Sequence, residues 1–186
     1  MDLSRRLHVP LLPGSGTLHV RPLRLADAEP LADAYTRNAR HLAPWEPHRD
    51  VSFFSAAGQE TVIRSKLSQF DAGSEVPWLI LSEEAILGTI TLTGIVRGPF
   101  LSANLGYWVD GPHTGKGLAR AAVAAVLAMA VQELALHRVQ AATLVHNTAS
   151  QSVLKRNGFE RIGLAPNYLK IDGTWQDHVL FQRILA

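Results

Sequence analysis

The chain has 186 residues, of which 47% are hydrophobic, and its 18 Lys and Arg residues against 16 Asp and Glu give a formal net charge of +2 with histidine neutral. This length suits one domain of ordinary size, and the hydrophobic fraction is sufficient for a core. Because the chain has no cysteine, disulfides, thiolate catalysis and cysteine-ligated zinc are excluded. The basic residues are scattered and form no lysine-rich arm, so no direct binding of nucleic acid is expected.

No segment has the composition of a membrane span or of a secretory leader. The start of the chain, MDLSRRLHVPLLPGSG, lacks a long apolar stretch, and the most apolar run, Ala121–Val131, is too short to cross a bilayer. The eight histidines form neither an H-x-H nor an H-E-x-x-H pattern, so no metal site is expected. We therefore expect a cytoplasmic protein that binds neither a membrane nor a metal.

Hydrophobic periodicity divides the first part of the chain into one strand and two helices. Apolar and polar residues alternate over Thr17–Leu23, which is the period of a half-buried strand. Asp27 stands where it can cap the following helix, and two prolines in Arg40–Asp50 favour a loop in which Trp45 is exposed. In chain order we expect a loose segment over residues 1–16, a strand over Thr17–Leu23, a helix over Ala28–Asn38, a loop over Arg40–Asp50 and a helix over Ser55–Phe70.

From Pro77 onward a period of two predominates, interrupted by two helices. Gly115–Leu134 is apolar nearly all round in its middle, so a helix buried on more than one side is expected there. A shorter helix ends near Gly158, where Phe159 can pack back in a Schellman motif. The expected elements are strands on both sides of Ser82–Ala85, a strand over Leu101–Asp110, a helix over Gly115–Leu134, a strand over His137–Val145, a helix capped by Asn147 or Thr148, and strands over Glu160–Pro166 and Trp175–Ile184. This order predicts a mixed α/β domain with one layer of sheet and helices on its faces.

A glycine-rich loop, DGPHTGKGLAR (Asp110–Arg120), stands between a predicted strand and the long helix. The first turn of a helix has backbone N–H groups without partners and the positive end of the helix dipole, so it binds anions, most often phosphates. Glycines let an anion approach the backbone closely, and Lys116 and Arg120 add positive charge. The loop therefore indicates a phosphorylated ligand.

Spacing argues against two familiar nucleotide-binding loops. A P-loop needs four residues between its glycines and then Lys followed by Ser or Thr, but Gly111 and Gly115 enclose three residues and Gly117 follows Lys116. A dinucleotide fingerprint needs a third glycine where this chain has Arg120. It also needs an acidic residue about 20 positions further on, at the end of the following strand, but the stretch TLVHN ends in Asn147.

The pattern from Thr114 to Ala119 resembles the signature of the GNAT superfamily of acetyl-CoA-dependent N-acetyltransferases, Gln/Arg-x-x-Gly-x-Gly/Ala. Thr114 replaces the first Gln or Arg, and the other positions match. The resemblance covers nearly the whole chain from Thr17, and it implies one domain over residues 1–186 with a single mixed, mostly antiparallel sheet, helices on both faces and a splayed central strand pair. Five further segments are similar, in order and spacing, to the ribosomal-protein-alanine N-acetyltransferase branch: HLAPWEP (His41–Pro47), LGYWVD (Leu105–Asp110), HRVQAATLVHNTAS (His137–Ser150), VLKRNGF (Val153–Phe159) and DGTWQDHVLF (Asp172–Phe181).

The resemblance implies where acetyl-CoA binds. The pantetheine arm would follow the end of a splayed strand at Tyr107–Val109, and the diphosphate would rest on the amides of Gly115–Ala119. Lys155 or Arg156 would meet the 3′-phosphate, although both also suit a solvated helix face, and Asn147 also suits a helix N-cap. The expected coenzyme contacts are Tyr107, Trp108, Val109, Thr114, Gly115, Lys116, Gly117, Leu118, Ala119, Arg120, Asn147 and Lys155.

The resemblance also implies the groups that take part in catalysis. Ser150 would lie near the thioester sulfur, where its hydroxyl protonates the leaving thiolate, although a place in the first turn of a helix also explains it. The amide of Val109 would donate to the thioester oxygen. Trp45 and Glu46 lie in a proline-flanked loop that the family places beside the acceptor amine, and Glu46 is the acidic candidate there. Some members of the family use a glutamate after the last GF motif as the general base, but this chain has Leu169 at that position. Either Glu46 acts as the base through a water molecule, or the reaction relies on the positioning of the two substrates alone.

These features predict an enzyme that moves the acetyl group of acetyl-CoA to a primary amine by direct attack, without an acyl-enzyme. Two classes of acceptor fit these features. One is the N-terminus of a protein, such as the N-terminal alanine of a ribosomal protein, and the other is a small-molecule amine. A non-catalytic domain that binds acyl-CoA for sensing or assembly would have the same glycine loop, and it is the alternative from another class. A homodimer is compatible with these features.

Overall fold

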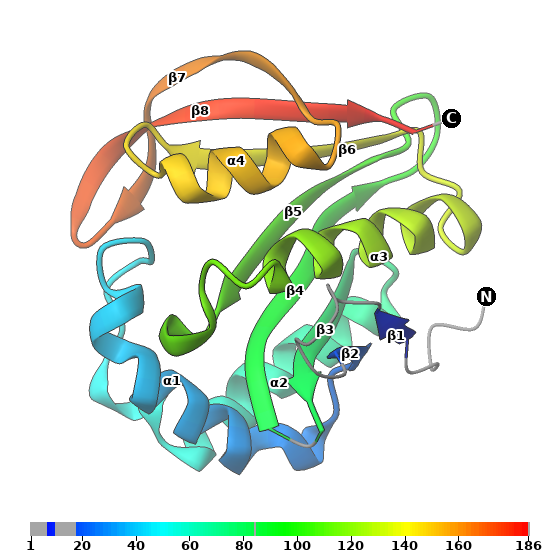
Figure 1. Cartoon of the computed structure of the whole chain (residues 1–186). Helices are drawn as coiled ribbons and strands as arrows, with labels where there is room; N and C mark the ends of the chain where they lie inside the picture. The colour runs from blue at the N-terminus through cyan, green and yellow to red at the C-terminus, as the bar shows by residue number, and fades with distance from the viewer. Residues whose placement is uncertain (1–6, 10–17, 84, 186) are drawn as a thin grey trace.

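The computed structural model describes residues 18–83 and 85–185, and the backbone of residues 7–9. In this part of the chain one sheet has the strand order β1-β2-β3-β4-β5-β6-β8-β7, with α-helices on its two faces (Figure 1). The strands are β1 (Leu7–Val9), β2 (Leu18–Pro22), β3 (Glu75–Ser82), β4 (Ala85–Val96), β5 (Ser102–Val109), β6 (Arg138–Leu144), β7 (Glu160–Ile171) and β8 (Thr174–Ile184). The α-helices are α1 (Ala28–Leu42), α2 (Ala56–Asp71), α3 (Leu118–Gln132) and α4 (Thr148–Arg156), and the 3-10 turns are η1 (Leu25–Asp27), η2 (Val51–Phe54) and η3 (Gly111–His113).

The sheet is antiparallel except between β5 and β6, which are parallel. Their pairing joins Ser102–Asn104 to Arg138–Gln140, although β5 continues to Val109 and β6 to Leu144. Beyond these residue pairs the two strands diverge, as Figure 1 shows. The predicted class is therefore confirmed as a mixed, mostly antiparallel sheet with helices on both faces and a splayed central pair.

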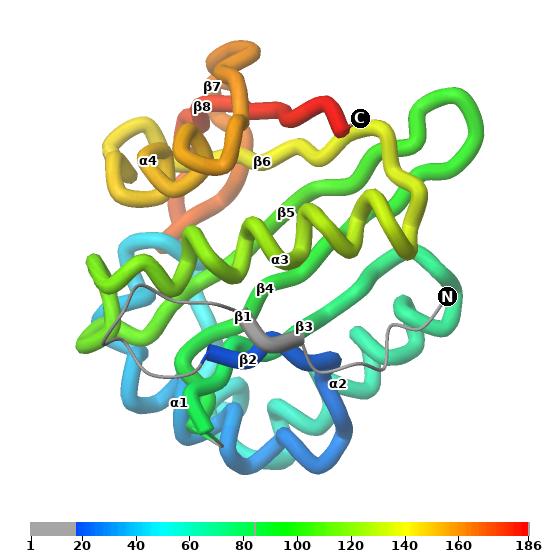
Figure 2. The backbone as a smooth tube through the Cα atoms, turned by 45° about the vertical axis from the view of Figure 1, so that its right-hand side comes forward, coloured from blue at the N-terminus to red at the C-terminus, as the bar shows by residue number. Residues whose placement is uncertain are grey.

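Alternate residues of β3 point to two hydrophobic cores, one on each face of the sheet. Val76, Trp78 and Ile80 pack with α3 in the larger core, whereas Leu79 and Leu81 pack with α1 and α2 in the smaller core. Helix α3 lies over β4 and β5 (Figure 2) and also contacts α4. It is therefore buried on more than one side, as its apolar composition predicts.

The predicted helices are present, but two of them have different ends. Helix α1 continues to Leu42, past the predicted end at Asn38, because Leu42 is buried in the smaller core. Helix α3 begins at Leu118, since Gly115 and Gly117 have φ angles of +76° and +84°, which are not helical. The glycine loop therefore precedes the helix instead of forming its first turn.

The structure corrects two further details. Asp27 stands at the N-cap position of α1, but its side chain does not cap that helix. Its carboxylate instead forms an ion pair with Arg21 at 2.7 Å and accepts a hydrogen bond from the amide of Arg24 at 2.7 Å. Strand β7 runs to Ile171, past the predicted end at Pro166, because a bulge accommodates the proline.

The segment over residues 1–16, expected to be loose, contains strand β1, which pairs antiparallel with β2. The rest of this segment, and Thr17 at the start of the first predicted strand, lie outside the described residues.

The two ends of α4 are as predicted. Asn147 accepts a hydrogen bond from the amide of Ser150 at 3.0 Å, so it is the N-cap. At the other end Gly158 has a φ of +75°, and the amide of Phe159 donates to the carbonyl of Leu154 at 3.1 Å. These contacts form the Schellman motif.

Candidate active site

The end of β5 presents backbone groups toward the splay. The amide of Asp110 donates to the Leu87 carbonyl of β4 at 2.7 Å, and residues in an antiparallel pair alternate between those that bond to the neighbouring strand and those that do not. The backbone groups of Val109 and Tyr107 therefore point to the other edge of β5, where β6 has diverged. A ligand that carries amides can pair with them as an added strand would.

The glycine loop offers a run of free amides. Within the described residues, the backbone N–H groups of Gly115 through Arg120 donate to no protein acceptor, whereas the next one, that of Ala121, donates to the Gly117 carbonyl at 3.0 Å. A Cβ added to Gly115 or Gly117 would meet no atom within 4 Å, so open space lies in front of the loop. Together with the positive end of the α3 dipole, these free amides are suited to bind an anion.

The side chains of this loop serve different purposes. Leu118 is buried in the larger core, so only its amide faces a ligand. Thr114 uses its hydroxyl to close the preceding turn, donating to the Gly111 carbonyl at 2.8 Å. Lys116 and Arg120 are exposed at the surface of the loop. The groups here that are suited to an anion are therefore backbone amides, with two exposed cationic side chains beside them.

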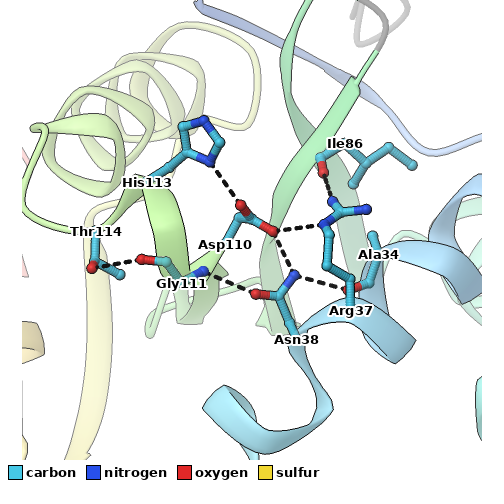
Figure 3. A network of polar contacts seen from close by, with 8 residues as sticks. All are labelled: Ala34, Arg37, Asn38, Ile86, Asp110, Gly111, His113 and Thr114. Carbon is cyan, nitrogen blue, oxygen red and sulfur yellow. Dashed lines mark hydrogen bonds and ion pairs between the residues drawn. The ribbon is translucent and has the colours of Figure 1, made fainter.

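Behind the loop, Asp110 is the centre of a polar network (Figure 3). One carboxylate oxygen accepts hydrogen bonds from Asn38 Nδ2 at 2.6 Å and Arg37 Nε at 3.0 Å, and the other lies 2.7 Å from His113 Nδ1. Asn38 also accepts from the amide of Gly111 at 2.9 Å. Burial by itself would raise the pKa of Asp110, but the hydrogen bonds from Asn38, His113 and Arg37 outweigh it and hold that pKa below its usual value. The carboxylate is therefore ionised at neutral pH.

Tyr107 and Ser150 meet across the splay. The Tyr107 hydroxyl lies 2.9 Å from Ser150 Oγ, which joins the end of β5 to the first turn of α4. Burial raises the pKa of Tyr107 to about 12, with the Ser150 hydrogen bond acting in the opposite direction, so the phenol is protonated at neutral pH. From the sequence, only a backbone contact is expected from Tyr107. Its partner is 43 positions away, and no local pattern indicates the pair.

The other expected coenzyme contacts are Trp108 on β5 and the exposed cations at the end of α4. Trp108 packs in the smaller core and donates from Nε1 to Tyr35 Oη at 3.1 Å. Because its backbone is on the β4 side, the structure places no polar group of Trp108 toward the splay. Lys155 and Arg156 are exposed on the last turn of α4. This turn lies against the start of α3, where Asn157 Nδ2 donates to the Arg120 carbonyl at 3.3 Å.

A cavity of about 150 Å³ lies on the face of the sheet that α1 covers. It is lined by α1, the loop that follows α1, η2 and the β7–β8 turn, and these contribute Tyr35, Glu46, Phe53 and Asp172 among others. From the sequence, Glu46 is expected at such a site but the other three residues are not. Tyr35 and Phe53 lie before and after Glu46 in the chain, whereas Asp172 is far from all three. None of them has a local sequence pattern that indicates the cavity.

Burial raises the pKa of Glu46 above its usual value, and Arg49, whose Nη2 lies 3.5 Å from Glu46 Oε2, acts in the opposite direction. The neighbouring Tyr35 has a pKa raised to about 12, first by burial and then by the charge of Glu46. A carboxylate with a raised pKa in a cavity is suited to accept a proton near neutral pH.

The loop that carries Glu46 lies beside the open end of the splay. The ring of Trp45 is 5.4 Å from that of His146, which follows β6, and the Glu46 carbonyl accepts from the Asp172 amide at 3.1 Å. Trp45 was expected to be exposed, but it is half-buried because it packs on His146, and it does not line the cavity. Glu46 therefore lines the cavity, whereas Trp45 packs against His146 and holds the loop in place.

The residues that the structure describes contain no candidate metal cluster and no candidate membrane-spanning helix. Among them no group of three or more His, Asp or Glu side chains is arranged to hold a metal ion. None of the helices in this part of the chain is long and apolar enough to cross a membrane.

A splayed strand pair, a helix terminus with free amides beside it and a cavity that contains two carboxylates on the opposite face are together suited to an acyl-coenzyme A-dependent transferase. Residues 17–160 match the acetyltransferase (GNAT) domain family. The chain therefore belongs to the GNAT family of acetyltransferases, and it is an acetyl-CoA-dependent N-acetyltransferase.

Three relatives support this assignment over most of the chain. The ribosomal protein uS5-alanine N-acetyltransferase of Escherichia coli (strain K12) is 36% identical over 166 residues, which are 88% of this chain and 85% of that protein. The crystal structure of the ribosomal-protein-S5-alanine acetyltransferase from Vibrio fischeri has a TM-score of 0.89 and 31% identity, covering 97% of this chain and 96% of that one. RimJ of Mycobacterium smegmatis in complex with CoA-disulfide also has a TM-score of 0.89 and 31% identity, covering 97% of this chain and 86% of that one. The predicted fold, activity and use of acetyl-CoA are thereby confirmed.

Proposed function

We propose that this enzyme acetylates the amino terminus of a protein whose first residue is small. The observation that carries the proposal is the size and charge of the cavity beside the splay. Its volume of about 150 Å³ is well below the roughly 300–1,000 Å³ of pockets that enclose drug-sized molecules. A chain terminus needs to insert only its first residue, and the carboxylates of Glu46 and Asp172 would attract its ammonium group.

The names of the relatives support the same choice, because two of them are described as S5-alanine acetyltransferases, and alanine is a small first residue. An acceptor among ribosomal proteins would make this a cytoplasmic enzyme.

In the proposed reaction the neutral amine attacks the thioester carbon, so that a C–N bond forms and the C–S bond breaks. Glu46 accepts the proton of the amine through a water molecule, and the amide of Val109 donates to the oxygen on which negative charge develops. The Ser150 hydroxyl donates its proton to the departing thiolate and regains one from solvent, while Glu46 releases to solvent the proton that it accepted from the amine. Tyr107, whose hydroxyl is 2.9 Å from Ser150 Oγ, orients that hydroxyl and is a second proton donor.

The same proposal assigns the parts of acetyl-CoA. The diphosphate is bound by the free amides of Gly115 through Arg120, and the pantetheine arm by the backbone of Tyr107 and Val109. The 3′-phosphate is assigned to Lys155 or Arg156, because their helix end lies against the first turn of α3.

A turnover assay tests the choice of acceptor. Release of coenzyme A thiol is measured with acetyl-CoA and peptides that begin with Ala, Ser, Leu or Trp, and with polyamines and free amino acids at equal concentration. We expect the highest kcat/KM for peptides that begin with Ala or Ser, and mass spectrometry should locate the acetyl group on the α-amine. Preference for a free small amine would contradict the proposal, and a lack of amine-dependent thiol release would favour a binding domain without activity.

The Ser150→Ala variant is expected to lower kcat about tenfold and to leave the Kd of acetyl-CoA unchanged. The loss is smaller than the roughly hundredfold or more of a lone general acid, because the Tyr107 hydroxyl remains nearby. The N-cap bond from the Ser150 amide to Asn147 does not need the hydroxyl, so α4 should stay intact. Steady-state kinetics and equilibrium binding measure the two quantities.

Ser152 is exposed on the same helix, so Ser152→Ala is the matched control and should retain full activity. The deficit of Ser150→Ala should shrink at high pH, where a thiolate leaves without a proton. Equal losses of kcat and of coenzyme affinity would instead assign Ser150 to the packing of α4.

A further inference from the structure

The start of the glycine loop is tied to helix α1, which is distant in the chain. Arg37 and Asn38, on consecutive positions of α1, both donate to one oxygen of Asp110, and Asn38 also accepts from the amide of Gly111 (Figure 3). Arg37 additionally donates from Nη2 to the Ile86 carbonyl of β4 at 2.8 Å. The junction between β5 and the loop is therefore fixed to both α1 and β4.

A local turn explains only one oxygen of the Asp110 carboxylate, the one beside His113 of η3. Asp110 stands at the N-cap position of η3, but its side chain makes no capping hydrogen bond to that turn. Its partners are instead side chains of α1 and the ring of His113, and the residue is only 2% exposed. Burying a charge this deeply is costly unless the charge is paired, so the network has a use beyond closing the turn.

Helix α1 supports both substrates at once. Its Tyr35 lines the acceptor cavity, while Arg37 and Asn38 hold the loop that leads to the free amides of Gly115 through Arg120. Aligned reactants are worth several orders of magnitude in rate, and small displacements are costly. A contact that fixes the loop relative to α1 thus fixes the coenzyme relative to the acceptor.

We propose that Asp110 is a positioning residue that, through Arg37 and Asn38, holds the glycine loop in the orientation needed to bind the coenzyme diphosphate. A carboxylate suits this task because it accepts several hydrogen bonds at once, and those from charged donors are the stronger ones. The inference rests on the proposed assignment of the diphosphate to this loop.

The test compares Asp110→Asn with the wild-type enzyme on two thioesters, acetyl-CoA and acetyl-pantetheine, which lacks the diphosphate. The variant should raise the Kd of CoA about tenfold, as the loss of a hydrogen bond to a charged group implies. Its kcat/KM should fall by a similar factor with acetyl-CoA and remain unchanged with acetyl-pantetheine. A purely structural role would lower activity equally with both thioesters.

Asp27 provides a matched control, since it is also buried, at 5% exposure, and also paired with an arginine. The Asp27→Asn variant should lower Tm without changing the Kd of CoA. If the Asp110→Asn variant does not fold, the Arg37→Gln variant is tested in its place. The Arg37 side chain is 47% exposed, so its replacement removes one hydrogen-bond donor to Asp110 without disturbing the core. A rise in the Kd of CoA of about threefold is then expected, within the range for one exposed ion pair.

The positioning role of Asp110 can be tested separately from the binding of the diphosphate by the glycine loop. An unchanged Kd of CoA in both Asp110→Asn and Arg37→Gln, or equal losses with the two thioesters, would overturn the positioning role. If Gly117→Val also leaves CoA binding unchanged, the diphosphate is not bound by this loop. If Gly117→Val weakens CoA binding while Asp110→Asn does not, only the role of Asp110 is wrong.

Discussion

Replacing Gly117 by valine is expected to weaken the binding of acetyl-CoA about a hundredfold, because several hydrogen bonds to a charged group are lost together. Gly117 has a φ of +84° and open space where a Cβ would stand. A branched side chain would occupy the space assigned to the diphosphate, and it would also strain the backbone that aims the free amides. Isothermal titration with CoA measures the change directly.

Gly98 separates these two causes. It also has a positive φ, +70°, with open space at its Cβ position, but it lies in the turn between β4 and β5. The Gly98→Val variant should therefore lose stability through backbone strain and keep the CoA affinity of the wild type. CoA affinity that is equally reduced in both variants would show that strain alone is responsible, and an unchanged affinity in Gly117→Val would remove the diphosphate from the loop.

Replacing Glu46 by glutamine is expected to lower kcat/KM for the amine about a hundredfold at neutral pH, the usual contribution of a general base. The loss should be largest where Glu46 is ionised and the α-amine, with an ordinary pKa of roughly 7.7–8.0, is still protonated. At higher pH the amine is neutral without help, so the deficit should shrink. The KM for acetyl-CoA should stay unchanged, and a pH profile of kcat/KM checks both statements.

The thermal stability of the Glu46→Gln variant is a second test of the role of Glu46. Since burial raises the pKa of Glu46, ionising this group in the folded state costs free energy, and that cost appears as pH rises through the interval between its unfolded and folded pKa values. Glutamine removes it, so the Tm of Glu46→Gln at neutral pH should be no lower than that of the wild type. A variant that is less stable but fully active would assign Glu46 to a structural ion pair with Arg49.

Glu60 is the matched control for Glu46. It forms an ion pair with Arg64 at 2.6 Å on the exposed face of α2, and its side chain is 47% exposed. Glu60→Gln removes a carboxylate from a similar short-range pair, and it should leave amine kinetics unchanged. Wild-type amine kinetics in Glu46→Gln as well would leave the enzyme without an identified base.

The elements of the sheet and the glycine loop could be predicted because their signals are local. Alternation marks the strands, and the spacing of Gly115 and Gly117 before an apolar helix indicates an anion site within a few residues. Errors arose where tertiary contacts override the local signal. Leu42 extends α1 because it is buried in a core, and Trp45 is covered by His146, which lies about a hundred positions further along the chain.

The residues that support the site could not be predicted from the sequence. Arg37 and Asp110 are 73 positions apart, and Tyr107 and Ser150 are 43 positions apart. Each pair forms because the sheet order brings separate strands and helices together, and neither partner has an unusual local pattern. Short-range reasoning therefore finds groups that bind through their own backbone, and it misses groups that act through a distant partner.

The splay has a consequence for how the sheet holds together. In the part of the chain that the structure describes, the ladder between β1–β5 and β6–β8 consists of the three residue pairs at Ser102–Asn104, and the amides of His137 and Arg138 donate to the Leu101 carbonyl just before it. The enzyme therefore has two half-sheets joined at one end. In the proposed complex, a coenzyme arm along Tyr107 and Val109 would supply amide hydrogen bonds where a neighbouring strand would lie. The coenzyme would then act as a non-peptide strand inserted between the halves, and each turnover would remove and restore a member of the sheet. Hydrogen–deuterium exchange at the end of β5 therefore reports coenzyme occupancy, with slow exchange in the complex and fast exchange after release.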